Sequence, residues 1–246
     1  MKMNDLMKWE FKNLIRSKAF WGMGIAFVLC TILFLLIPLC EGGHTGYQLY
    51  LENLNNFNSL MLFLAGIFAG IHITGAFEDR KIQSAVMAGN TRFSILITKT
   101  VSFFVAMAAF FISSVGISTL VAFVAVGAGD VEGSFFVSVI VRGSVLMLAD
   151  ISFVSICLVI SMLIRNQGAS ITINLLSLIL LYCGSEALFG IEWCAKLLRY
   201  TPVGQMLYLF SDVSDGNLMT ACAVSVVGII AAVGVSYIKF AKEELK

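Results

Sequence analysis

Residues 19–39 read AFWGMGIAFVLCTILFLLIPL, and none of these 21 side chains carries a charge. A helix rises about 1.5 Å per residue, so about 20 apolar residues cross the hydrocarbon core of a bilayer. The stretch therefore predicts a transmembrane helix. It is too long for the apolar core of a cleaved signal peptide, and 18 residues precede it, so we expect a retained anchor.

Other apolar stretches of similar length follow along the chain. They cover residues 57–77, 100–126, 143–164, 169–189 and 218–238. Backbone groups in lipid need partners within their own segment, and these stretches are too long and too evenly apolar for barrel strands. The sequence thus predicts an all-α polytopic membrane protein with six transmembrane helices, forming a single transmembrane domain over residues 1–246.

The composition agrees with this class of protein and excludes others. Apolar residues make up 59% of the 246 residues, charged residues 13%, and the mean hydropathy is +0.93. An ordinary soluble domain has about 25% charged residues. A soluble globule and a disordered chain are therefore excluded, and the net charge of +1 gives no reason to expect a nucleic-acid partner.

The basic residues indicate the orientation. Of the 16 Lys and Arg residues, 13 lie before the first span, between spans two and three, between spans four and five, or after span six. The opposite side has only Arg142, Lys196 and Arg199. Positive residues stay in the cytoplasm, so we expect both termini there, with a net charge of +7 on that side and −6 on the remainder.

Residues 3–18 have the pattern of an amphipathic helix, with Asn4 as a plausible N-cap. A basic amphipathic helix beside a span is expected to lie in the membrane interface, although an ordinary basic anchor is the alternative. One face would carry the apolar side chains of Met3, Leu6, Met7, Phe11 and Leu14, and the other Asp5, Lys8, Lys12 and Arg16.

The segment of residues 78–92 also stands out. Four charges leave the second span together, an apolar stripe of Ile82, Ala85 and Val86 follows, and residues 89–90 read Gly-Asn, a helix stop. So short a helix is not stable alone in water and needs a partner surface, either on its own chain or on another. In the segment of residues 190–217, two short amphipathic stretches flank Pro202, which predicts two short helices at or dipping into the outer interface.

Few residues offer chemistry. The chain has no phosphate-binding loop, no H-E-x-x-H motif and only two histidines, so we expect neither an enzyme nor a metal site. The carboxyl group of Asp150 lies well inside a span, where it is either a polar contact in a translocation path or a structural hydrogen-bonding group. The same alternatives hold for His72, and a disulfide between Cys183 and Cys194 is left open.

This layout resembles the permease subunit of ABC-2-type exporters. Residues 10–18 (EFKNLIRSK) look like the N-terminal interfacial helix of that family, and residues 78–81 (EDRK) followed by 90–99 (NTRFSILITK) look like its coupling-helix region. The Gly-Thr usual after the acidic residue is replaced here by Ile82-Gln83-Ser84, which shifts the expected position of the coupling helix by a few residues.

The resemblance implies a transport subunit in the cell membrane, of bacterial type, without cofactors of its own. Two separate ATPase chains carrying ATP and Mg²⁺ would be partners, together with a second permease, identical or paralogous, and the lipid bilayer. The short form implies export of an amphipathic or hydrophobic substrate such as a peptide antibiotic or drug. The implied ATPase-coupling residues are Glu78, Asp79, Arg80, Lys81, Ile82, Val86, Gly89 and Arg92.

By the same analogy, the translocation path would lie between two permeases and involve spans two and five. Candidate residues for that path are Asp150 and His72. The main alternative function is an ion-coupled secondary transporter or channel that uses Asp150 as its coupling site. An intramembrane enzyme is disfavoured because no catalytic cluster is visible.

Overall fold

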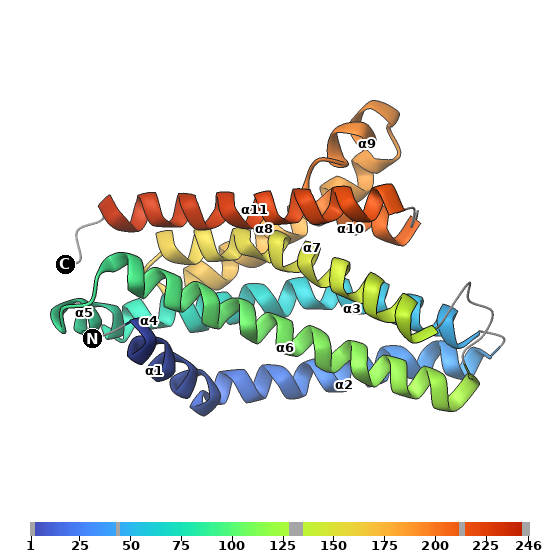
Figure 1. Cartoon of the computed structure of the whole chain (residues 1–246), viewed down its shortest axis with the longest axis horizontal. Coiled ribbons are helices and arrows are strands. Elements are labelled where there is room, and N and C mark those ends of the chain that lie inside the picture. Colours follow the sequence, from blue (N-terminus) through green and yellow to red (C-terminus); the bar gives the residue numbers. More distant parts are fainter. Residues whose placement is uncertain (1–2, 43–44, 128–134, 212–214, 243–246) are drawn as a thin grey trace.

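The computed structural model describes residues 3–42, 45–127, 135–211 and 215–242, and every regular element in them is a helix (Figure 1). Six of the described helices are long and apolar enough to cross a membrane, which confirms the predicted all-α polytopic class. They are α2 (Lys18–Glu41), the continuous run of α3 (Gly46–Ala69), η1 (Gly70–Thr74) and α4 (Gly75–Glu78), α6 (Arg92–Val126), α7 (Phe135–Leu163), α8 (Gln167–Phe189) and α11 (Asp215–Lys242).

Several of these helices begin well before the apolar stretch that predicted them. Helix α3 starts at Gly46, whereas the apolar stretch starts at residue 57. A capping box explains the start, because Thr45 Oγ1 accepts a hydrogen bond from the Gln48 amide and Gln48 Oε1 accepts one from the Thr45 amide. Helix α6 likewise starts directly after its N-cap Thr91, whose hydroxyl oxygen accepts a hydrogen bond from the Ser94 amide. Hydropathy marks the part of a helix that suits lipid, and caps mark where the helix begins.

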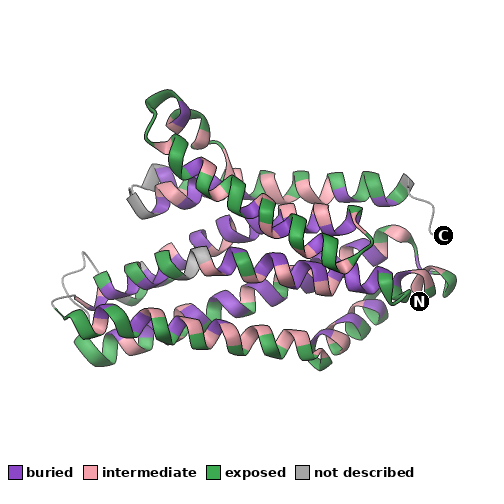
Figure 2. Ribbon diagram, turned by 180° about the vertical axis from the view of Figure 1, so that it is seen from behind, coloured by how far each residue is buried: buried purple, intermediate pink, exposed green. Residues whose placement is uncertain are grey.

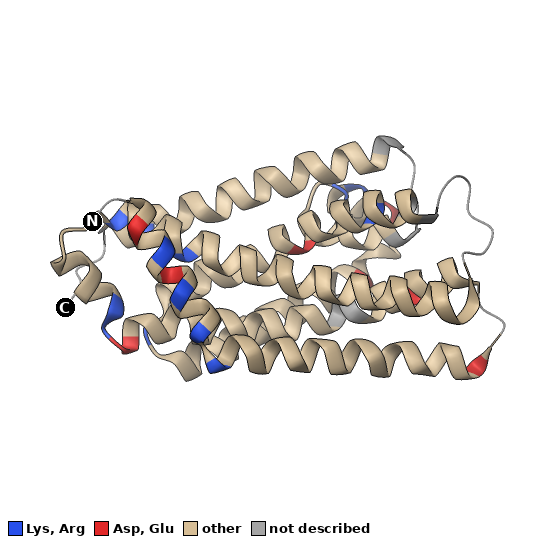
Figure 3. Ribbon diagram, turned by 60° about the horizontal axis from the view of Figure 1, so that its bottom comes forward, with Lys and Arg blue, Asp and Glu red and all other residues tan. Residues whose placement is uncertain are grey.

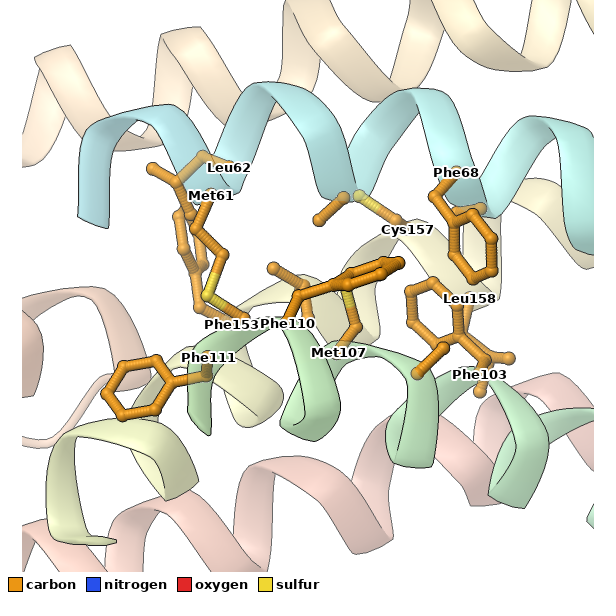
Figure 4. Close-up of a cluster of buried hydrophobic side chains, with 14 of the residues drawn as sticks. Met61, Leu62, Phe68, Phe103, Met107, Phe110, Phe111, Phe153, Cys157 and Leu158 are labelled. Atoms are coloured by element: carbon orange, nitrogen blue, oxygen red, sulfur yellow. The ribbon is translucent and has the colours of Figure 1, made fainter. Parts of the chain in front are cut away.

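Helices α3 and α7 form the centre of the bundle. In the membrane-spanning windows of α3 and α7, 67% of the residues are buried inside the bundle, whereas in α2, α8 and α11 only 17–22% are (Figure 2). The largest core cluster joins α3, α6 and α7 (Figure 4). Among its fully buried members are Phe68, Phe103 and Phe153, one from each helix. Outward-facing Leu, Ile and Val on the outer helices suit contact with lipid.

Spans two and five pack closely along three glycines. A Cβ atom at Gly70 would lie 2.4 Å from Ile171 Cγ1 of α8, and one at Gly66 would lie 3.3 Å from Leu178 Cδ1. At Gly75 a Cβ would meet Gln167 at 3.4 Å. Small residues of this kind let membrane helices approach closely, which strengthens their van der Waals packing.

We expect Gly70→Val to destabilise the bundle by about 1–3 kcal/mol, the usual cost of overpacking a filled core. Gly184→Ala in α8 is the matched control, because a Cβ there would meet no atom within 4 Å. Thermal unfolding of both purified variants in detergent measures the difference. An unchanged melting temperature for Gly70→Val would contradict this packing of spans two and five.

The short helices lie at the two ends of the bundle (Figure 1). We call one end the basic end: it holds α1 (Met3–Arg16), α5 (Lys81–Met87) and the last turn of α11, and most of the coloured Lys and Arg positions gather there (Figure 3). The opposite end holds α9 (Glu192–Leu198) and α10 (Pro202–Ser211). The two short helices predicted around Pro202 are therefore confirmed. Proline is the first residue of α10, a position that needs no amide donor.

Three details of the sequence-based expectations need correction. Helix α1 already includes Met3, so Asn4 lies inside the helix and is not its N-cap. The buried face of α1 consists of Leu6, Glu10 and Leu14, whereas Met3, predicted on the apolar face, is exposed. The predicted range of residues 3–18 also divides, because α1 ends at Arg16 and α2 begins at Lys18. Cys183 and Cys194 are both free thiols.

Candidate functional site

The predicted coupling segment forms a short, sharply bounded helix. Before α5, Arg80 adopts the left-handed conformation with φ of 56°, which turns the chain out of α4. After α5, Gly89 has φ of 81°, and the backbone amide and the side-chain amide of Asn90 both donate to Ala85 O. Asparagine and glycine end the helix as predicted, because glycine accepts a positive φ without strain.

One side of α5 is fixed to its own chain. Ile82 is 1% exposed and faces a narrow gap shared with Leu6 and Trp9 of α1 and Ile95 of α6. The other side is open, with Met87 86% exposed and Lys81 and Ser84 also exposed. Helix α5 is thus held in place by residues of α1 and α6. Its other side presents an open surface at the basic end.

Glu78 connects the start of this segment to span five. Its Oε1 atom accepts a hydrogen bond of 2.9 Å from the backbone amide of Gln167, the first residue of α8. The Asn166 side chain caps the same helix by accepting from the Ala169 amide at 2.9 Å. A carboxylate at a helix N-terminus is favourable, because the free amides and the helix dipole carry partial positive charge there.

Arg92 connects the end of the segment to span six. Its Nη1 atom donates to Phe240 O at 3.1 Å and to Ala241 O at 3.0 Å, two carbonyl groups of the last turns of α11. The last carbonyls of a helix have no partner within it, and a cation satisfies them well. The predicted coupling residue Arg92 therefore faces the bundle. Asp79 and Lys81 instead form an exposed ion pair with an O–N distance of 2.7 Å.

A buried ionic cluster lies behind α5 and joins α1, η1 and α6. Lys99 Nζ is 2.6 Å from Glu10 Oε1, and His72 Nε2 is 3.6 Å from the same oxygen. His72 Nε2 is also 2.8 Å from Ser102 Oγ. The side chains of Glu10, Lys99 and His72 are 5%, 9% and 8% exposed. The carboxylate and the ammonium compensate each other, so the cluster can remain buried.

The cluster lines one wall of a polar cavity of about 190 Å³ at the basic end. Asp79 and Lys81 reach the same cavity from the coupling segment, and Gln167 reaches it from α8. The cavity therefore lies at the junction of α1, span two, span five and the coupling segment. Its charges are already paired, Glu10 with Lys99 and Asp79 with Lys81, which leaves no unbalanced charge for a small ionic ligand.

Sequence reasoning missed the pair of Glu10 and Lys99. They lie 89 residues apart, and no helical or strand periodicity links them. A signal was present nonetheless, since Glu10 falls at the same helical spacing as Leu6 and Leu14, on the face that became buried. A carboxylate on the buried stripe of a helix requires a partner, and Lys99 at the beginning of an apolar span is a natural one.

The two candidate path residues lie in different surroundings. His72 belongs to the buried cluster and lines the polar cavity. Asp150 is fully buried in α7, and neither of its carboxylate oxygens has a hydrogen-bond partner in the part of the chain that the structure describes. The cavity that His72 lines does not include Asp150, so this cavity does not join the two residues into one path.

A polar network, also not foreseen from the sequence, ties spans two, four and five together. Asn174 Nδ2 donates to Gly66 O at 3.2 Å and to Ser161 Oγ at 2.9 Å. The Thr74 hydroxyl lies 2.8 Å from Ser170 Oγ and 3.0 Å from Ser161 O. Hydrogen bonds of this kind hold membrane helices in a defined register. They surround η1, the wide turn from which His72 projects.

The sequence matches no protein-family model and no curated protein. Among the described residues, no group of three or more His, Cys, Asp and Glu side chains is placed to hold a metal ion.

Proposed function

We propose that this chain is the transmembrane permease subunit of an ATP-driven ABC exporter of the ABC-2 type, coupled to separate ATPase chains. The observation that carries the proposal is α5. A helix of seven residues between spans two and three is fixed on one side by Ile82 and open on the other at Met87. Such a surface suits the cleft of a partner protein. The excess of basic residues at this end supports a cytoplasmic position for it, where ATP is available.

The contacts of the segment suggest how ATPase closure reaches the membrane. A displacement of α5 acts on span five through the bond from Glu78 to the start of α8, and on span six through the bonds from Arg92 to the end of α11. It acts on α1 through Ile82. Three membrane-associated helices would thus respond to one movement, which gives the short helix leverage over the whole bundle.

The substrate in this proposal is hydrophobic or amphipathic, such as a peptide antibiotic or a drug. An apolar pocket of about 230 Å³ lies between α3 and α8, which are spans two and five. Its lining includes Leu62, Phe63 and Ile179, with Tyr182 as a polar contribution. Apolar pockets with few polar groups are typical sites for such molecules. A second permease, identical or paralogous, would face this side in the plasma membrane.

Met87 offers a direct test of the partner surface. Fully burying a methionine side chain is worth about 1.5–3 kcal/mol, so we expect Met87→Gln to weaken binding of the ATPase chain by about tenfold or more. Binding is measured by co-purification of the two chains and by titration of the purified ATPase onto the permease in nanodiscs. Met219→Gln is the matched control, because Met219 is 77% exposed near the opposite end of the bundle.

If no ATPase chain co-purifies with the wild-type protein, or if Met219→Gln weakens binding as much as Met87→Gln, the proposed coupling surface is wrong. ATPase binding and substrate transport are measured separately. If the ATPase binds but the expected substrate is not transported, the proposed coupling surface still stands.

Asp150 favours a second candidate, an ion-coupled secondary transporter or channel. A fully buried carboxyl group without a hydrogen-bond partner among the described residues is costly in a membrane, and such groups are often retained for function. Under the ABC proposal, Asp150→Asn leaves ATP-dependent transport within about threefold, because the proposed coupling runs through Glu78, Arg92 and Ile82 and not through residue 150. Under the second candidate, transport dissipates an ionic gradient, and Asp150→Asn abolishes transport. Transport in proteoliposomes, with ATP or with an imposed proton gradient, distinguishes them.

A further inference from the structure

We infer that the outward face of α1 is a docking surface for phospholipids with anionic headgroups. The face is a shallow groove of about 540 Å³ that follows α1 along its length. Two rows of side chains line it, each with a spacing of four residues: the cations Lys8, Lys12 and Arg16, and the apolar side chains Met7, Phe11 and Ile15.

The three cations have no partner in the part of the chain that the structure describes. Lys8, Lys12 and Arg16 are exposed, and none of them forms an ion pair or hydrogen bond with another described residue. The groove lining contains no carboxylate. The contrast with Lys99 is informative, because that cation at the same end of the bundle is buried against Glu10. The opposite face of α1 holds Glu10 and binds the protein, so the basic row is left for another anion.

The position of the groove indicates that this anion is a lipid. A single residue, Ser17, separates α1 from the transmembrane helix α2. Trp21, in the first turn of α2, donates its indole Nε1–H to Ile15 O at 2.8 Å, and its ring is 58% exposed. Tryptophan favours the level of the headgroups, with its ring toward the acyl chains. The last turn of α1 is thereby held at that level.

The two rows match the two parts of a phospholipid. Cations spaced four residues apart, about 6 Å along the helix, can contact headgroup phosphates, while the apolar row lies against the upper part of an acyl chain. A soluble anion would contact only the row of cations. An acidic protein would leave the apolar row unexplained, since Ile15 is 57% exposed and borders a transmembrane helix. The pair of rows therefore favours an anionic lipid over a free phosphate or an acidic peptide.

Native mass spectrometry of the purified full-length protein tests the inference. Detergent-solubilised protein is titrated with phosphatidylglycerol or phosphatidylcholine, and the bound lipids are counted. Each basic residue near an anionic membrane surface is worth roughly fivefold in affinity. We expect Lys12→Gln to weaken phosphatidylglycerol binding by about fivefold, and Lys8→Gln/Lys12→Gln/Arg16→Gln by about a hundredfold, with little change for phosphatidylcholine.

Lys239→Gln is the matched control, because Lys239 is an exposed lysine at the same end of the bundle, on α11. Phe11→Ser is expected to weaken both lipids, since it removes apolar contact. Equal phosphatidylglycerol affinity in the triple variant and the wild type, or an equal loss in Lys239→Gln, overturns the inference. Competition by free glycerol phosphate at the affinity of the intact lipid overturns it in favour of a soluble anion. A triple variant that binds lipid normally but loses its ATPase chain overturns it in favour of a protein contact.

Discussion

Replacing Lys99 with methionine is expected to reduce the free energy of unfolding by about 3–5 kcal/mol, the cost of removing one partner from a buried ion pair. The substitution leaves the carboxylate of Glu10 5% exposed, and among the described ion-pair contacts of Glu10 only the one with His72 remains, at 3.6 Å. Glu10→Gln is expected to have a comparable effect, because the ammonium of Lys99 then lacks its carboxylate at 2.6 Å. Thermal unfolding in detergent, followed by tryptophan fluorescence, measures both changes.

Two comparisons make this prediction specific. Lys81→Met breaks the ion pair with Asp79, which has a similar N–O distance of 2.7 Å but is more than half exposed. We expect that substitution to cost at most about 1 kcal/mol, since exposed pairs contribute little. The double substitution Glu10→Leu/Lys99→Met removes both buried charges, and we expect it to recover most of the lost stability. Equal losses for Lys99→Met and Lys81→Met would contradict the buried pair.

Reversing the charge of Glu78 is expected to reduce transport by about tenfold to a hundredfold, a change that corresponds to losing about 1–3 kcal/mol of coupling. Glu78→Lys removes the acceptor for the Gln167 amide and places a cation against the positive end of α8. In the proposed mechanism this cuts the link from the coupling segment to span five. ATP hydrolysis by the complex is expected to continue without export, so the ratio of substrate exported to ATP hydrolysed is the measurement.

The neighbouring residue provides the control. Asp79→Lys makes the same change of charge one residue further along, but Asp79 bonds only the exposed Lys81 among the described contacts. We expect it to leave the transport ratio within about twofold, because exposed pairs contribute little. If both reversals leave export intact, the role of the segment as the ATPase-coupling site fails. If both charge reversals abolish export equally, the charge on the exposed face of the segment matters more for export than the hydrogen bond from Glu78 to α8.

The architecture could be predicted from the sequence because its signals are local. Twenty consecutive apolar residues meet the thickness of a bilayer, as in residues 19–39, and this condition does not depend on neighbours. The end of α5 was also readable, since residues 89–90 carry their own helix stop. The start of α3 was not, because polar residues before residue 57 hide a helix that hydropathy does not mark.

The candidate site was predicted only in part, because its important contacts are long-range. Ile82 was expected to face a surface of its own chain or of a partner, and the resemblance assigned it to the ATPase contact, whereas it packs against α1 within the same chain. Arg92 was assigned to the ATPase contact from its position in the segment, but its guanidinium group reaches residues 240–241. No spacing in the sequence reports such pairings. Residues near one another in a segment need not point in the same direction.

The wide turn η1 has a consequence for how span two could move. In an α-helix each amide bonds four residues back, whereas the amide of Gly75 reaches Gly70 O, five residues back. The position of such a wide turn moves along a helix when one backbone hydrogen bond at a time is exchanged. Each step along the helix carries one residue through the wide turn and rotates it by about 100°. Span two could therefore reorient His72 while its two ends stay in place, held by packing against spans one, three, four and five.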